Sequence, residues 1–323
     1  SNRFPMEQPT DTKLPAAAPV APELAALVIH ESPGLRWYHL EDPDSPLLDR
    51  LGQEFGFHEL EIEDCRHQRH QAKLEEYENH IFVIANTLHF VKETAGVWFG
   101  EVAFFVGQDF LVTVHLGPTR SVKEVVPRVK ATAKMQRPDK VVYYMLDNMV
   151  DRYLPVLDEF GDRIDQVEDD CHGSAGPAML EEIFALKRGL IEFRRTLGSM
   201  REMVNALMRL RAPYYRADMA AYWRDLYDHV IRALTIIDSY RDLVASVLEV
   251  YLTAVANRTN EVMKVLTIYA TIVTPMLVIT GYFGMNFHHL PLLEWRYGVM
   301  VVNILMLGMT VGLLFYFRRR KWF

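Results

Sequence analysis

The sequence predicts an α+β protein in which a long, charged front part precedes two membrane-spanning helices. Residues Val265–Phe287 contain no Asp, Glu, Lys, Arg or His, and a second uncharged run covers Tyr297–Phe317. A helix needs about 20 apolar residues to cross a bilayer, so both runs are long enough. Upstream of them, short strand-like apolar segments mix with helical patterns before a long helical region begins.

The composition argues against several classes of function. The 323-residue chain has a net charge of -7, which argues against nucleic-acid binding. Its two cysteines, Cys65 and Cys171, lie far apart and outside any Cys-x-x-Cys motif, which fits a reducing compartment and disfavours a structural zinc site. The sequence has no Gly-rich phosphate loop, His-Glu-x-x-His motif or nucleophile elbow, so we expect neither an enzyme nor an organic cofactor.

The first 145 residues are predicted to form a tail and a layered domain. Residues 1–23 are rich in Pro, Ala and Thr, so we expect a disordered tail, and a start at Ser1 without Met fits a tag remnant. Residues 24–145 are predicted to be a cytosolic α/β-layered domain. Its expected elements are strands at Ile81–Ala85, Gly100–Val106 and Phe110–Val114, and a helix within Ser121–Met135.

Residues 146–212 are predicted to be a helical hairpin. We expect two helices between Val141 and Arg211, broken by the Gly- and Pro-containing segment Cys171–Pro177. The first helix carries an acidic face formed by Asp151, Asp158, Asp162, Asp165 and Asp169. An ordinary solvated face is the simpler interpretation, and a surface that attracts cations is the alternative.

A single long helix is predicted to follow. Pro213 suits a first helical turn, and no Pro or Gly occurs after it until Pro275, so one helix of roughly 90 Å can run into the first span. We expect a stalk at 213–262 that packs against copies of itself through apolar positions at helical spacing. These positions are Leu226, Val230, Leu234, Ile237, Leu243 and Val247. The remaining segments are predicted as span 263–283, external loop 284–296, span 297–317 and basic tail 318–323.

The positive charges predict the orientation in the membrane. Arg318, Arg319, Arg320 and Lys321 follow the second span, and Arg258 and Lys264 precede or begin the first. Cytoplasmic flanks carry the excess of Lys and Arg, so both termini should be cytoplasmic in a multi-pass protein of the inner membrane.

One face of the first span is small and mildly polar, which indicates a pore. Small residues also permit close helix packing, and that is the alternative. One two-span subunit cannot enclose a pore, so a ring of copies in the lipid bilayer is required. The face consists of Asn260, Met263, Thr267, Ala270, Thr274, Leu277 (or its neighbour Val278) and Gly281.

The end of the first span offers oxygen ligands to a hard cation. Asn286 supplies a side-chain carbonyl oxygen, and Gly284 gives the backbone freedom to turn. Mg²⁺ prefers oxygen ligands and gives up its water reluctantly, so neutral oxygens facing a hydrated ion suit it.

The C-terminal hundred residues resemble the CorA family of divalent-cation channels. The resemblance rests on Asn-Glu-Val-Met-Lys-Val-Leu-Thr at Asn260–Thr267, on Gly-Met-Asn-Phe at Gly284–Phe287, and on the segments Arg224–His229 and Arg318–Phe323. It implies a homopentameric funnel with a cytosolic α/β domain, a stalk helix that becomes the pore-lining span, and an outer second span.

The resemblance also assigns expected roles to individual residues. Gly284, Met285 and Asn286 match the outer mouth, where relatives hold hydrated Mg²⁺. Met263 matches a hydrophobic constriction, for which Leu266 is the next candidate. Asn260 and Glu249 match a polar and an acidic ring. Asp225 matches a residue that binds regulatory Mg²⁺, and Asp228 lies one turn away.

Two departures from the family pattern keep a zinc transporter as the alternative. Val91 stands where an acidic partner of Asp225 is expected, so regulation by Mg²⁺ should be weaker than in a typical relative. The outer loop carries His288 and His289 with only Glu294, which would suit Zn²⁺, as in the ZntB branch with its possible proton coupling. Met285 favours the Mg²⁺ channel, which could also pass Co²⁺ or Ni²⁺. A non-conducting scaffold or sensor of the same shape is a third interpretation.

Overall fold

The computed structural model describes residues 24–67, 71–91, 96–117, 119–171, 176–210, 217–285 and 295–322. The described chain divides into two compact units. The first contains the residues up to Ile164 together with Phe184–Val244, and the second contains Asp165–Ile183 and Ala245–Phe323.

A six-stranded mixed sheet forms the centre of the first unit. Its strand order is β1-β2-β6-β5-β4-β3, and only β2 and β6 pair in parallel. The strands are β1 (Val28–Ser32), β2 (Leu35–Leu40), β3 (Lys73–Glu76), β4 (Ile81–Val91), β5 (Gly96–Val106) and β6 (Phe110–His115). The predicted α/β-layered arrangement is therefore present, with three strands that were not predicted.

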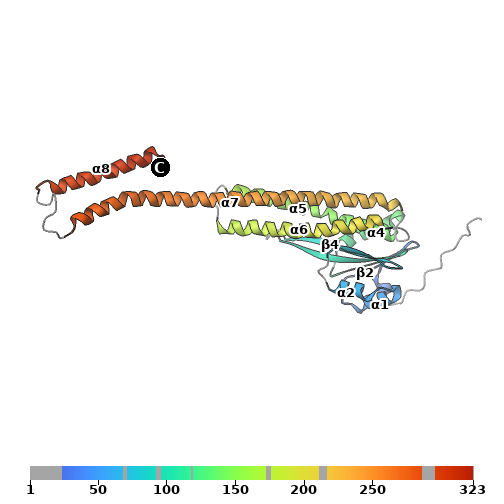
Figure 1. The fold of residues 1–323 in the computed structure, drawn as a ribbon. Helices are drawn as coiled ribbons and strands as arrows, with labels where there is room; N and C mark the ends of the chain where they lie inside the picture. Colours follow the sequence, from blue (N-terminus) through green and yellow to red (C-terminus); the bar gives the residue numbers. More distant parts are fainter. Residues whose placement is uncertain are drawn as a thin grey trace, which may run out of the picture. The chain divides into compact units, whose positions relative to one another are not determined.

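Helices cover both faces of this sheet (Figure 1). On one face, α1 (Pro46–Phe55) and α2 (Glu59–Arg66) pack their apolar residues against alternate side chains of the strands. On the other, α4 (Pro138–Asp151) contacts β4 and β5, and α3 (Arg120–Ala131) contacts β1 and α4. Ser45 caps α1, and the left-handed Gly56 ends it at a φ of 72°.

Three helices, not two, occupy the region expected to be a hairpin. The part after α4 contains α5 (Tyr153–Cys171) and α6 (Pro177–Arg209). The break between α4 and α5 falls at Arg152, because Pro155 has no N–H to donate to the Asp151 carbonyl. Asp151 consequently belongs to α4, whereas the other residues of the acidic face lie exposed on α5.

The long helix α7 covers Ala220–Phe283 and continues through Pro275. A 3₁₀ turn at Ala217–Met219 precedes it, so the described helix begins later than the predicted Tyr214. Leu226, Val230 and Ile237 are fully buried within the single chain. For these three positions the expectation of packing against copies of the chain is wrong, because the chain itself already covers them; Leu243 is 43% exposed, and there it stays a prediction. The last helix, α8, covers Gly298–Arg319.

Candidate functional site

The apolar end of α7 and the whole of α8 are long and apolar enough to cross a membrane. Their most apolar stretches are almost entirely unburied within the chain. Met263 is 55% exposed and Leu277 is 64% exposed, which is unusual for large apolar side chains that face water. These surfaces therefore need lipid or other protein chains to cover them.

Every residue of the predicted pore face lies on α7 and is exposed. These are Asn260, Met263, Thr267, Ala270, Thr274, Leu277 and Gly281, together with Leu266 and the more N-terminal Glu249. The Thr267 hydroxyl donates to the Met263 carbonyl at 2.7 Å. Because its proton is used inside the helix, Thr267 presents oxygen lone pairs outward, where they can accept from the water of a hydrated cation.

Gly284 follows the last residue of α7 at a position with little room for a side chain. Its N–H donates to the Thr280 carbonyl at 2.9 Å, and a Cβ at this position would lie 3.0 Å from the same oxygen. A side chain would thus force the turn to shift. Met285 follows and is exposed. Asn286, His288, His289 and Glu294 lie outside the described residues.

A second group of ligand-type side chains lies between α4 and the first part of α7. We name it the Asp147 cluster; it contains Asp147, Asp151 and His229, with Asp225 beside them. The first three offer ligand atoms that all lie within 4.8 Å of one another. His229 Nδ1 lies 3.7 Å from Asp147 and 3.8 Å from Asp151, and His229 Nε2 lies 3.9 Å from Asp225.

The electrostatics of the Asp147 cluster favour a bound cation. Burial raises the pKa of Asp147 to about 6, and the nearby Asp151 and Asp225 carboxylates act in the same direction. The Tyr143 hydroxyl donates to Asp225 at 3.1 Å and fixes the orientation of that carboxylate. His229 Nδ1 is buried and has no hydrogen-bond partner among the described residues. A divalent ion would relieve the repulsion between the carboxylates.

Only part of this cluster was predicted from the sequence. Asp225 and Asp228 were expected ligands, but Asp228 is not among the grouped ligand atoms, whereas His229, the next residue, is. Asp147 and Asp151 are separated by four residues and therefore share one face of α4, which the sequence does show. What the sequence could not show is that this face of α4 meets α7.

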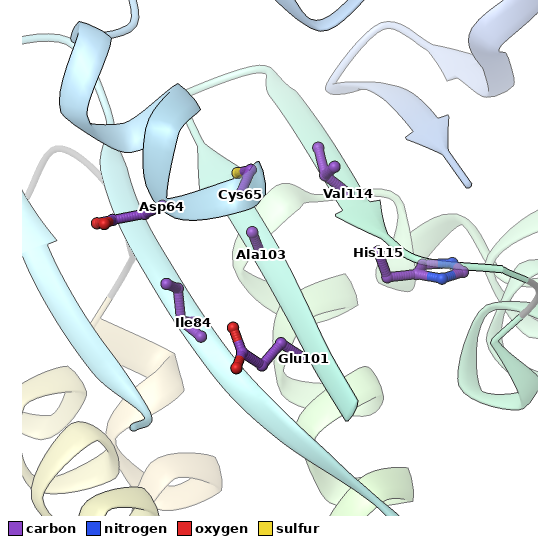
Figure 2. A pocket seen from close by; sticks show the side chains of 7 residues that line it. All are labelled: Asp64, Cys65, Ile84, Glu101, Ala103, Val114 and His115. Atoms are coloured by element: carbon purple, nitrogen blue, oxygen red, sulfur yellow. The ribbon is translucent and has the colours of Figure 1, made fainter. Parts of the chain in front are cut away.

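A buried thiol marks a third place where reactive side chains gather. Cys65 lines a cavity of about 10 Å³, room for roughly one water molecule, together with Asp64, Glu101 and His115. Figure 2 shows Asp64 and His115 directed away from Cys65 on opposite sides. Burial raises the pKa of the Cys65 thiol, so it remains protonated. These diverging side chains do not form a metal site.

Comparison with known proteins places the chain in a family of transporters. A sequence profile described as CorA-like Mg²⁺ transporter protein matches residues 32–319. The cobalt/magnesium transport protein CorA of Thermotoga maritima is 32% identical over 279 residues, covering 85% of this chain and 80% of the relative.

Two solved structures have a similar fold. The complete structure of the CorA magnesium transporter of Methanocaldococcus jannaschii matches with a TM-score of 0.76 and 21% identity, covering 90% of this chain and 91% of that one. The cytoplasmic domain of ZntB from Vibrio parahaemolyticus matches with a TM-score of 0.56 and 13% identity, covering 70% and 88%. At these identities the likeness shows the fold alone, so it does not discriminate between magnesium and zinc.

Proposed function

We propose a transport function for this chain, which belongs to the CorA family of divalent-cation transporters. It carries Mg²⁺ through a pore that is lined by α7 in a ring of five copies. The observation that carries the proposal is the exposed pore face on the apolar end of α7, which runs from Asn260 to Gly281. Because polar residues recur along this face, we call it the polar line. The T. maritima relative is named as a cobalt/magnesium transport protein, so Co²⁺ is a second expected cargo.

The spacing of the polar line supports a ring of helices. From Asn260 to Gly281 it advances 21 residues in six steps, an average of 3.5. A 3.5-residue repeat keeps facing a common axis when α-helices wrap around one another with a left-handed twist. An isolated anchor has no need for such a regular line.

The residues of this line suit a hydrated cation. Asn260 and Thr267 offer oxygen atoms, and Ala270 and Gly281 leave room for the ion's water molecules. At Met263, a ring of apolar side chains narrows the path and can stop ions by excluding water. Asn286 would hold the hydrated ion at the outer end, directly after the turn at Gly284.

The positive charges support an orientation with both termini in the cytoplasm. The helix α8 ends at Arg319, within the basic run Arg318–Lys321. The proposed segments keep the boundaries expected from the sequence, with spans at 263–283 and 297–317 and an external loop between them.

The Asp147 cluster is proposed as the cytosolic cation site that controls the pore. With Val91 in place of an acidic residue, Asp225 lacks the partner expected from a neighbouring copy. Asp147, Asp151 and His229 supply further ligand groups from the same chain as Asp225. Closure by Mg²⁺ should therefore depend on these groups.

The proposal is tested with the purified full chain in liposomes that contain a Mg²⁺ indicator. Asn286→Ala should abolish Mg²⁺ entry, because it removes the only side-chain oxygen of the Gly-Met-Asn triplet. Asn303→Ala, in α8, is the matched control and should keep it. Native mass spectrometry of both samples should give five chains. Unchanged Mg²⁺ entry in Asn286→Ala, or assemblies no larger than dimers, would refute the proposal.

Zinc transport is the second candidate, and the pair His288-His289 in the loop favours it. The same liposomes are then tested with Zn²⁺, with and without a proton gradient. Magnesium entry that needs no gradient supports the main proposal. Entry of Zn²⁺ alone, accelerated by the gradient, supports the alternative, and no flux of either ion supports a non-conducting sensor.

A further inference from the structure

Two histidines on neighbouring parallel strands bring their ring nitrogens together at one end of the sheet. His39 of β2 pairs with Thr113 of β6, and the Gly117 N–H extends the pairing by donating to the Glu41 carbonyl at 2.9 Å. Side chains two residues apart on a strand share a face, so Thr113 and His115 lie on the same side. The Nε2 atoms of His39 and His115 are 3.3 Å apart.

The neighbours of His39 determine which of its nitrogens carries the proton. The Thr113 hydroxyl donates its single proton to the Tyr38 carbonyl at 3.2 Å and accepts from Trp37 Nε1 at 3.1 Å. With the Thr113 proton assigned to the Tyr38 carbonyl, the imidazole is the donor in the 2.9 Å contact between Thr113 Oγ1 and His39 Nδ1. His39 Nε2 is left with a lone pair that faces His115.

Both imidazoles are well shielded from water. The side chain of His39 is 8% exposed, and His115 is 5% exposed as a residue. Burial lowers the pKa of both, that of His39 to about 4, so both are in the neutral form that binds metals. Glu41 is more than half exposed and places Oε1 3.7 Å from His39 Nε2.

We propose that His39, His115 and Glu41 bind a divalent transition-metal ion such as Zn²⁺, Co²⁺ or Ni²⁺. Two nitrogens bound to a tetrahedral zinc ion, each about 2.05 Å away, lie about 3.3 Å apart, which matches the observed separation. The exposed Glu41 side chain can rotate to complete a third bond. Water occupies the fourth position.

The surroundings of His39 fit this chemistry. Histidines that bind metals usually donate their other ring N–H to a fixed acceptor, and Thr113 is that acceptor for His39. Imidazole ligands select transition metals over Mg²⁺, which prefers oxygen. Cys65 takes no part, because the His115 ring points away from it (Figure 2). The site is therefore distinct from the Asp147 cluster and does not depend on the identity of the transported ion.

The test uses the full chain in detergent with His288→Ala and His289→Ala as background, which removes the imidazoles of the outer loop. Zinc binding is measured by competition with a chromophoric chelator in excess Mg²⁺, so that oxygen sites are filled. We expect one tight Zn²⁺ per chain, and a loss of affinity of at least about tenfold in His39→Gln and in His115→Gln. The visible absorption of bound Co²⁺ should change in parallel.

Three further variants distinguish this site from zinc binding elsewhere in the chain. Glu41→Gln changes an exposed side chain without threatening the fold and should still weaken binding. His89→Gln, on β4, is the matched control and should bind Zn²⁺ normally, and thermal unfolding without metal checks that each variant is folded. Unchanged affinity in His39→Gln, His115→Gln and Glu41→Gln would overturn the proposal. A loss confined to His229→Asn would place the metal in the Asp147 cluster instead.

Discussion

The first and last parts of α7 differ in where their apolar side chains find contacts. Near its start, Leu226, Val230 and Ile237 are fully buried. Near its end, Met263, Leu266 and Leu277 are each more than half exposed. The backbone is helical throughout, so the difference lies in what surrounds it.

This difference shows that one continuous helix serves first as part of a protein core and then as an uncovered apolar segment. The first part is a core helix of the N-terminal unit, where Tyr143 of α4 packs on Trp223 and Arg194 of α6 pairs with Asp238. No described residue buries the most apolar stretch of the last part. That stretch needs lipid or other protein chains to cover it, since exposing it to water costs about 25 cal/mol for each Å².

The largest expected effect comes from removing a contact of the buried part. Ile237→Ala should lower the free energy of unfolding by about 2–5 kcal/mol, because it leaves a cavity among packed helices. Leu277→Ala, the matched change in the exposed part, should alter it by less than about 0.5 kcal/mol. Thermal unfolding in detergent, followed by tryptophan fluorescence, measures both. Equal losses would mean that the two parts are equally packed.

The next largest effect concerns a charge on α4 that lies beside the first part of α7. The pKa of Asp147 is raised from 3.8 to about 6, so ionising it opposes folding. Its contribution to stability is fully present below pH 3.8 and is lost as the pH rises through 6. At pH 7 without Mg²⁺, Asp147→Asn should therefore stabilise the protein by ~1–2 kcal/mol after solvent screening.

The same variant tests the Asp147 cluster as a cation site. Magnesium should raise the melting temperature of the wild type and protect it from proteolysis, and both effects should fall in Asp147→Asn and in Asp225→Ala. Asp158→Asn, in the exposed acidic face of α5, is the control and should respond like the wild type. If Asp147→Asn keeps the full Mg²⁺ response, the cluster does not bind the ion; if it is less stable than the wild type at pH 7 without Mg²⁺, the pKa of Asp147 is not raised as described.

The smallest change in stability is expected from a substitution in the exposed last part of α7. The same substitution should clearly change transport. Met263→Gly should leave the melting temperature of the N-terminal unit unchanged but make the pore leak under closing conditions, because the apolar constriction is lost. Met300→Ala, an exposed methionine of α8, should not leak. The measurement is Mg²⁺ entry into liposomes with saturating internal Mg²⁺. A flat result would move the constriction to Leu266.

Parts of the fold could be predicted where local pattern and final environment agree. The apolar runs at Ile81–Ala85, Gly100–Val106 and Phe110–Val114 all lie in strands, because both faces of this sheet are buried. The strand β4 continues beyond the apolar run Ile81–Ala85 to Val91, through residues that are more polar. Pairing with β5 holds them in place, including the stack of His89 on Trp98 at 3.8 Å.

Two further differences between the predicted and the observed elements also have identifiable causes. The break at Arg152 follows from Pro155, which the helical pattern around it concealed. The strand β2 was missed because Arg36 and His39 interrupt its apolar residues without a strict alternation, and its parallel partner β6 lies more than 70 residues away in the chain. Only the assembled sheet makes Leu35–Leu40 a central strand.

The sequence by itself determined the family, the two apolar spans and the polar line on α7, because these features depend on the order of residues along one helix. The tertiary structure decided which side chains meet across elements. The Asp147 cluster requires α4 beside α7, and the approach of His39 to His115 requires β2 beside β6 in a particular register. Such contacts join residues 76 or more positions apart, and their geometry follows from packing rather than from local spacing.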